Sequence, residues 1–206
     1  MMSTPRPQLF TIGHSNHTLA AFNALLRQHA VTAVADVRSA PYSRRCPHFN
    51  KERLRPALQS QGIAYVFLGA ELGARSKDPS CYERGRVQYD RLAVTTQFQR
   101  GLERVLTGAQ SYRVALMCAE REPLECHRTL LVARALEQRG AQITHIRADG
   151  SLESQHAALL RLLSLLNMSH GSHGEHGDLF GAEQQLIEAA LRRQSVRIAY
   201  VDESMR

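Results

Sequence analysis

The chain has 206 residues, of which 43% are hydrophobic and 22% charged, so it can bury one substantial core and has the composition of an ordinary globular protein. No stretch approaches the roughly 20 apolar residues that a membrane-spanning helix needs, and residues 1–8 contain no apolar run. We therefore expect neither a membrane span nor a secretory signal. The net charge of +7 favours anionic partners such as nucleotides, nucleic acid or other phosphates, although a basic surface also serves solubility alone.

The chain contains four cysteines, and no two of them have the CxxC spacing: Cys46, Cys81, Cys118 and Cys126. Without a predicted secretory signal, reduced thiols in the cytoplasm are the better expectation than a disulfide framework. The spacings also remove the main support for a zinc ribbon or a thioredoxin-like site.

Short apolar runs alternate with helical patterns along most of the chain. Strands are predicted at 9–12, 31–37, 63–68, 114–118 and 142–146, and helices at 18–29, 50–61, 90–106, 124–139 and 154–166. Residues 69–86 are rich in Gly, Ser, Asp and Pro and are predicted to form a long loop. This alternation predicts an α/β fold in three layers, with a mostly parallel five-stranded sheet and helices on both faces.

The composition changes after residue 166. We expect an α/β domain at 1–166, a flexible Gly/His-rich linker at 167–181, and a C-terminal helix and tail at 182–206. The helix is predicted at 182–194, followed by an extended segment at 196–201. Because residues 182–201 have an apolar face that needs a partner, this tail could fold back over the rest of the chain.

Polar side chains follow four of the five predicted strands, where each strand ends. In open α/β sheets ligands bind beyond that edge, so the pattern predicts a functional site there. The candidates are His14 and Ser15 after the first strand, Asp36, Arg38, Ser43 and Arg44 after the second, Arg75 after the third, and Cys118, Glu120, Cys126, His127 and Arg128 after the fourth.

An anionic ligand is the first use for these groups. Guanidinium groups match phosphate oxygens, so Arg38, Arg44 and Arg128 are candidates to hold the anion, with Ser15 and Ser43 as hydroxyl donors. The Asp36–Arg38 pair has a second interpretation, as a buried ion pair that only orders its loop.

Catalytic roles are the second use. His14 or His127 would act as general acid or base, and Asp36 or Glu120 would orient a base or an attacking group. Cys126, near a predicted helix N-terminus and beside two basic residues, is a candidate nucleophile. Each also has a structural interpretation: His14 as a capped surface histidine, and the cysteines as buried small side chains.

Several named chemistries are excluded by their spacing. The P-loop, dinucleotide-binding and GxSxG motifs are absent, and neither Cys118 nor Cys126 has an arginine six residues later, as a cysteine phosphatase requires. A metal bound by Cys118, Cys126 and His127 with Glu120 is conceivable by ligand type. Because adjacent residues rarely both point at one ion, no metal is predicted. The sequence indicates no particular cofactor and no oligomeric state, and the His-rich segment at 167–181 is interpreted as a solvated linker.

A set of short motifs resembles one family. The segments are Thr11–Ser15, Asp36–Arg38 with Pro41 and Ser43, Leu72–Gly73, Met117–Glu120, Cys126–Arg128, His145–Ile146, Asp178–Phe180, and Gln194 with Arg197–Tyr200. Their order and spacing are similar to those of the domain of unknown function 488 family, over roughly residues 9–201. Ala74 departs from the pattern, since members often have a second glycine there.

The resemblance implies a Rossmann-like α/β domain with a role in nucleotide or nucleic-acid processing, but no established reaction. The leading hypothesis is an enzyme that acts on a phosphate-bearing substrate. The alternatives are a non-catalytic module that binds nucleotide or nucleic acid, and a thiol- or metal-dependent sensor that uses Cys118, Cys126 and His127.

Overall fold

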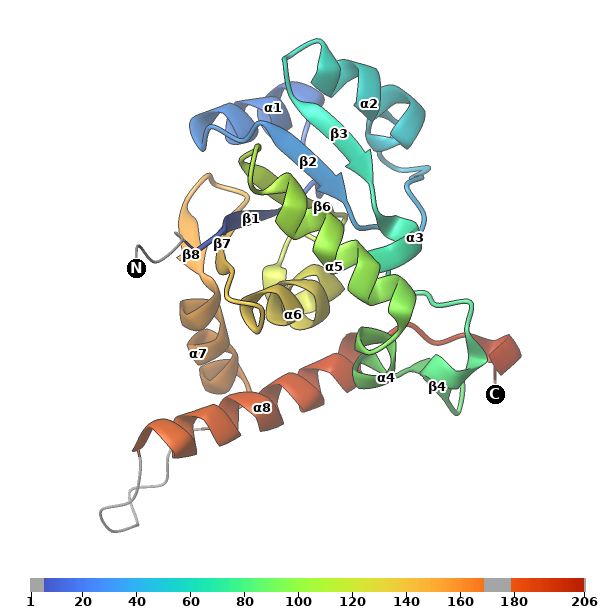
Figure 1. Ribbon diagram of the computed structural model, residues 1–206, viewed down its shortest axis with the longest axis vertical. Helices are drawn as coiled ribbons and strands as arrows, with labels where there is room; N and C mark the ends of the chain where they lie inside the picture. Colours follow the sequence, from blue (N-terminus) through green and yellow to red (C-terminus); the bar gives the residue numbers. More distant parts are fainter. Residues whose placement is uncertain (1–5, 169–178, 206) are drawn as a thin grey trace.

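A six-stranded sheet forms the centre of the molecule, as Figure 1 shows in a computed structural model that describes residues 6–168 and 179–205. The strand order is β3-β2-β6-β1-β7-β8, and every neighbouring pair is parallel except β7 with β8. The strands are β1 (Gln8–Gly13), β2 (Ala33–Asp36), β3 (Ala64–Phe67), β6 (Val114–Cys118), β7 (Gln142–Ile146) and β8 (Leu152–Ser154). The mostly parallel α/β fold and its five predicted strands are confirmed, and β8 is an addition.

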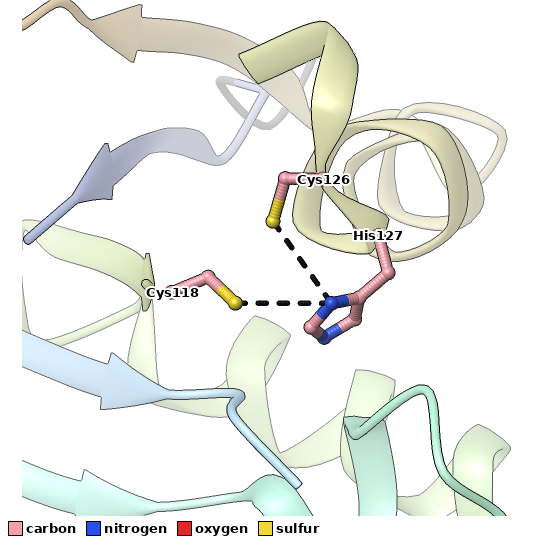
Figure 2. Close-up of side chains that lie close together, drawn as sticks. All are labelled: Cys118, Cys126 and His127. Atoms are coloured by element: carbon pink, nitrogen blue, oxygen red, sulfur yellow. Dashed lines mark hydrogen bonds between the residues drawn. The ribbon is translucent and has the colours of Figure 1, made fainter. Parts of the chain in front are cut away.

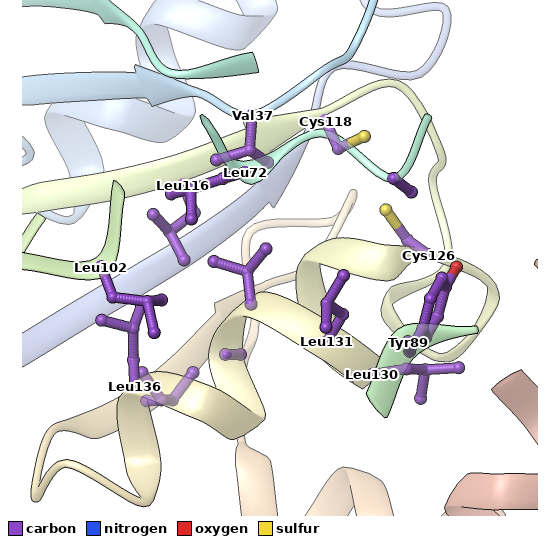
Figure 3. Packing of buried hydrophobic residues seen from close by; sticks show 14 of the residues in the cluster. Val37, Leu72, Tyr89, Leu102, Leu116, Cys118, Cys126, Leu130, Leu131 and Leu136 are labelled. Carbon is purple, nitrogen blue, oxygen red and sulfur yellow. The ribbon is translucent and has the colours of Figure 1, made fainter. Parts of the chain in front are cut away.

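Helices cover both faces of this sheet because successive residues of a strand point to opposite sides. In β6, Ala115 and Met117 pack with α1 (Leu19–Gln28) and α2 (Lys51–Gln59) on one face. Leu116 and Cys118 face α5 (Thr96–Gly108) and the helices that follow β6 on the other, where Figure 3 shows part of the larger cluster. The continuous burial of β6 explains why its sequence is apolar throughout.

Two predictions between β3 and β6 were wrong. The helix predicted at 90–106 is two helices, α4 (Tyr89–Ala93) and α5, because Thr95 caps the second one: its hydroxyl oxygen accepts a hydrogen bond from the Phe98 amide at 3.2 Å. The predicted loop at 69–86 contains a short helix, α3 (Gly69–Leu72), and a small hairpin of β4 (Tyr82–Glu83) and β5 (Arg86–Val87).

The single helix predicted at 124–139 is also wrong. The segment begins as a 3-10 turn, Pro123–Glu125, continues as a π-helix, Arg128–Ala133, and ends as α6 (Arg134–Glu137). π-helical turns inside α-helices are often found at functional sites.

The C-terminal helix is longer than predicted. The helix predicted at 154–166 is present as α7 (Gln155–Leu165), and α8 (Leu179–Ile198) packs against it, so the apolar face of α8 does have a partner. Val196 lies inside α8 rather than in an extended segment. After α8, Val201 pairs with Arg86, and the carbonyl oxygen of Tyr200 accepts from the Val87 amide at 3.0 Å. Most of the predicted linker at 167–181 lies outside the described residues.

Among the described residues, no helix is both long and apolar enough to cross a membrane.

Candidate functional site

A pocket of about 390 Å³ lies at the carboxyl ends of the strands, where the sequence predicts the site. Its walls come from the ends of β1, β2 and β6, from the loop after α3, and from the end of α8 and the residues after it. The lining residues are His14, Arg38, Ser39, Ala40, Tyr42, Ser43, Ala74, Arg75, Tyr89, Cys118, Ala119, Glu120, Glu125, Cys126, His127, Ile198 and Tyr200. The last two come from the C-terminal segment, which therefore reaches the pocket; the sequence allowed this folding back but did not decide it.

The guanidinium group of Arg38 forms hydrogen bonds with other residues of the protein. Its Nε donates to Oδ1 of Asp36 at 2.9 Å, and its Nη2 donates to Oδ2 of Asp36 at 2.6 Å and to the carbonyl oxygen of Phe49 at 2.8 Å. Tyr65 donates its hydroxyl to the same carboxylate at 2.7 Å. Asp36 and Arg38 therefore form the buried ion pair that the sequence offered as the second interpretation, and this network orders the loop after β2.

His14 is buried beside Arg38, so it is not a surface histidine. Its Nδ1 lies 2.9 Å from the carbonyl oxygen of Ser15, which can only accept, so Nδ1 carries the hydrogen. Its Nε2 therefore accepts from Nη1 of Arg38 at 3.1 Å. Burial, followed by the positive charge of Arg38, lowers the pKa of His14 to about 4. At neutral pH this ring is uncharged, with both nitrogen atoms engaged, and it positions Arg38.

Arg128 is fully buried and holds the loop that follows β6. Its Nη1 donates to the carbonyl oxygen of Glu120 at 2.6 Å, and its Nη2 donates to that of Arg121 at 3.3 Å. Gly13 allows this loop to approach β1, because a Cβ atom at Gly13 would collide with the same Glu120 carbonyl. The guanidinium of Arg128, which the sequence offered as an anion ligand, is thus used to position Glu120.

Cys118, Cys126 and His127 come together, as Figure 2 shows, and all three line the pocket. Nδ1 of His127 lies 3.7 Å from Sγ of Cys118 and 3.9 Å from Sγ of Cys126. Nε2 of His127 lies 3.0 Å from the carbonyl oxygen of Val37, so Nε2 carries a hydrogen and Nδ1 faces the two sulfurs. All three residues are buried.

The backbone explains how the adjacent residues Cys126 and His127 reach one point. Cys126 is extended, with φ −139° and ψ 139°, whereas His127 is helical, with φ −60° and ψ −25°. The chain turns between them into the π-helix, so both side chains face the end of β6. The expectation that neighbouring residues point apart holds within a regular element and fails at this junction.

Glu120 adds a carboxylate to this cluster. Its Oε2 accepts a hydrogen bond from the Cys126 thiol at 2.9 Å. Burial, together with the charge of Cys126, raises the pKa of Glu120. Burial opposes ionisation of Cys126, but its hydrogen bond with Cys118 and the charge of Arg128 lower its pKa well below the usual value.

The pKa values of the other two residues of the cluster are both raised. Burial, then the contact with Cys126, raises the pKa of the Cys118 thiol well above its usual value. Burial alone would lower the pKa of His127, but its hydrogen bond and charge interaction with Cys126 raise it. The neighbouring thiols of Cys118 and Cys126 therefore have oppositely shifted pKa values, which is typical of reactive sites.

Of the remaining predicted anion ligands, Ser43 lines the pocket, whereas Ser15 and Arg44 do not. The Ser43 hydroxyl lines the pocket and accepts from the Cys46 amide at 3.0 Å, so its hydrogen remains available to a ligand. Ser15 and Arg44 are outside the residues that line the pocket; Ser15 donates its hydroxyl to Asn16, and Arg44 is exposed.

The pocket is also lined by Arg75, a strand-end candidate to which the sequence assigned no role, and by three tyrosines that were not site candidates. Arg75 is exposed, and its guanidinium lies 4.5 Å from the centre of the Tyr200 ring, which the tail brings to the pocket. Tyr42 is 64% exposed, and Tyr89 is buried beside Cys126 (Figure 3). Arg75 and Tyr42 lie in loops that follow predicted strands, so the sequence could indicate them. Tyr89 and Tyr200 lie in segments that reach the pocket only through the tertiary fold.

Comparison with known proteins gives one result. The model of a family described as "Domain of unknown function DUF488" matches residues 18–135, which is more than half of the chain. The match includes Asp36, Arg38 and the Cys118–His127 segment and ends before β7, so it is narrower than the resemblance at residues 9–201. No curated protein and no solved structure matches the chain.

Proposed function

Since the chain belongs to the DUF488 family, which is defined by sequence rather than by a reaction, we propose its function from the pocket: it is an enzyme that acts on a phosphate-bearing substrate, such as a nucleotide or nucleic acid. The observation that carries this proposal is the buried group of Cys118, Glu120, Cys126 and His127 in a pocket that also contains an exposed arginine.

Catalytic groups are supplied by the buried cluster. Glu120 and Cys126 are within hydrogen-bond distance of each other, so a proton can pass between carboxylate and sulfur, and both line the pocket. Glu120 is the group best placed to move a proton at the substrate. His14 and Asp36 act one step away, by fixing the Arg38 side chain and the loop that it holds.

Recognition of the anion is assigned to Arg75 and Ser43. Arg75 presents a guanidinium at the pocket, which suits the oxygens of a phosphate group. The Ser43 hydroxyl supplies a second donor. Arg38 and Arg128 are not assigned as the main anion ligands, because their guanidinium groups already donate hydrogen bonds to protein atoms.

Turnover by the full-length protein tests this assignment. The protein is incubated with nucleotides, short single- and double-stranded DNA and RNA, and small phosphate esters, and the products are separated by chromatography and identified by mass spectrometry. We expect one ligand class to be converted. Glu120→Gln should abolish conversion and retain binding, because it removes the proton acceptor without changing the shape of the side chain.

Glu103→Gln, on the exposed side of α5, is the matched control and should convert the substrate at the wild-type rate. If no phosphate compound is converted, the proposal that the protein is an enzyme acting on such a substrate is refuted. If a ligand binds but is never converted, the protein is a binding module, and the catalytic assignment of Glu120 is wrong.

A further inference from the structure

The three side chains that meet in the pocket have the spacing of a metal site. Their ligand atoms, two sulfurs and Nδ1 of His127, all lie within 4.8 Å of one another. Zinc bonds of about 2.3 Å to sulfur and about 2.1 Å to nitrogen, at a tetrahedral angle, separate the two ligand atoms by about 3.6 Å. The observed separations of 3.7 and 3.9 Å therefore need a shift of only a few tenths of an ångström.

The histidine ring is already oriented as a ligand. Nε2 donates to the Val37 carbonyl oxygen, so the lone pair of the neutral ring is on Nδ1, on the side of the sulfurs (Figure 2). A metal-bound histidine usually donates its other N–H to a carbonyl or carboxylate, which fixes the tautomer and the ring orientation. The hydrogen bond from Nε2 of His127 to Val37 is a contact of this kind.

The chemistry of the donors selects the metal. Two thiolates and one imidazole are soft and intermediate ligands, which favour zinc over the oxygen-binding ions magnesium and calcium. We propose that Cys118 Sγ, Cys126 Sγ and His127 Nδ1 bind one Zn²⁺ ion. Each cysteine binds as a thiolate, and any thiol proton leaves to solvent.

Three protein ligands leave one tetrahedral position for a water molecule or a substrate oxygen, as in catalytic rather than structural zinc sites. All three ligands line the pocket, and so does Glu120, whose Oε2 lies 2.9 Å from Sγ of Cys126. A water at the open position would have this carboxylate as a hydrogen-bond acceptor. This use of the open position rests on the proposed function, whereas binding of the ion does not.

Cobalt substitution tests the ion without any substrate. The full-length protein is treated with a chelator in the presence of a non-thiol reductant and titrated with Co²⁺ while its absorption spectrum is recorded. We expect one equivalent to bind, with a thiolate-to-cobalt charge-transfer band in the near ultraviolet and the intense visible bands of tetrahedral Co²⁺. Competition with a chromogenic chelator then gives the Zn²⁺ affinity.

Variants assign the ligands. Cys118→Ser and His127→Gln should each weaken Zn²⁺ binding by more than about 100-fold, since losing a ligand costs more than losing a contact behind it. Cys46→Ser is the matched control: Cys46 is also a buried free cysteine, but it lies outside the cluster, and its variant should bind Zn²⁺ like the wild type.

Two results would overturn the site: a wild-type protein whose Co²⁺ spectrum has no thiolate charge-transfer band, or a loss of affinity in Cys46→Ser equal to that in Cys118→Ser. The first needs no variant, so misfolding of a variant cannot obscure it. Zinc binding without conversion of any phosphate compound would leave the ion in place and refute the proposed substrate. Full conversion by chelator-treated protein would leave the proposed substrate in place and refute the use of the open position in the reaction.

Discussion

At the scale of single residues, the Asp36–Arg38 pair contributes to stability because it is buried and almost fully hydrogen-bonded. Arg38→Ala would leave the Asp36 carboxylate buried without its partner. We expect this variant to lower the free energy of unfolding by about 3–5 kcal/mol. Urea denaturation measures the change. Arg44→Ala, which removes an exposed arginine from the same loop, should change it by less than about 0.5 kcal/mol; equal effects would contradict the role of the pair.

His145 makes the stability depend on pH. Burial, followed by the charge of Arg128, lowers its pKa from 6.5 to about 4. The unfolded chain therefore takes up this proton at a higher pH than the folded chain does. The stabilisation is fully present above pH 6.5 and is lost as the pH falls to about 4, by up to about 3 kcal/mol.

Urea denaturation at a series of pH values between 7 and 4 checks this expectation. His145→Gln should have a flatter dependence of unfolding free energy on pH than the wild type. His156→Gln, at a side chain that is 62% exposed, is the control and should follow the wild type. An equal pH dependence in His145→Gln and in the wild type would contradict the lowered pKa of His145.

The sequence placed most site residues at the right edge of the sheet but could not assign their roles. The strand ends follow from apolar runs, which is why His14, Arg38, Glu120 and Cys126 were placed at the edge where the pocket lies. Whether an arginine faces a ligand depends on acceptors that are distant in the chain. The partner of Arg38 at Phe49 is supplied by a 3-10 turn, Pro47–Phe49, that no local pattern indicates.

At the scale of elements, α8 ties the C-terminal segment to the domain. Ile187, Ala190 and Leu191 are buried against the rest of the molecule, and the Gln194 side chain donates to the Leu124 carbonyl oxygen at 2.8 Å. Leu124 lies in the turn that leads to Cys126. The helix therefore supports the segment that carries two of the proposed ligands.

Leu191→Ala tests this packing. Leu191 is 1% exposed, so we expect a loss of about 2–5 kcal/mol in the free energy of unfolding, together with weaker Zn²⁺ binding. Val196→Ala, on the same helix but 53% exposed, is the control and should cost less than about 0.5 kcal/mol. If Leu191→Ala and Val196→Ala unfold with the same denaturation midpoint, the close packing of α8 against the domain is contradicted.

The elements that were wrongly predicted have specific causes. Thr95 interrupts a continuous apolar pattern by capping a new helix. The turns of the π-helix are wider than those of an α-helix, but the apolar pattern of the sequence does not mark where it begins. The apolar pattern also does not mark the change from extended to helical backbone between Cys126 and His127. The periodicity of apolar residues indicates that an element is present, but it does not indicate a change of backbone conformation inside that element. The change at Cys126 and His127 is the one that brings the proposed ligands together.

At the scale of the whole molecule, the net charge of +7 favours anionic ligands, and the exposed Arg75 lies at the pocket. A positive protein attracts phosphate-bearing ligands over a distance, and this attraction is screened by salt. We expect ligand affinity to decrease as ionic strength rises, more steeply for a nucleic acid than for a mononucleotide, because more phosphates are contacted. Binding titrations at two salt concentrations measure the slope; equal affinities at both would show that charge plays no part.

The measurement that tests the central claim most directly is the thermal shift of wild type, Arg75→Ala and Arg44→Ala with nucleotides, short DNA and RNA, and inorganic phosphate. We predict that one phosphate-bearing ligand raises the melting temperature of the wild type and of Arg44→Ala, and that Arg75→Ala loses the shift. No shift with any of these ligands, or an unchanged shift in Arg75→Ala, would contradict the placement of a phosphate-bearing substrate in this pocket.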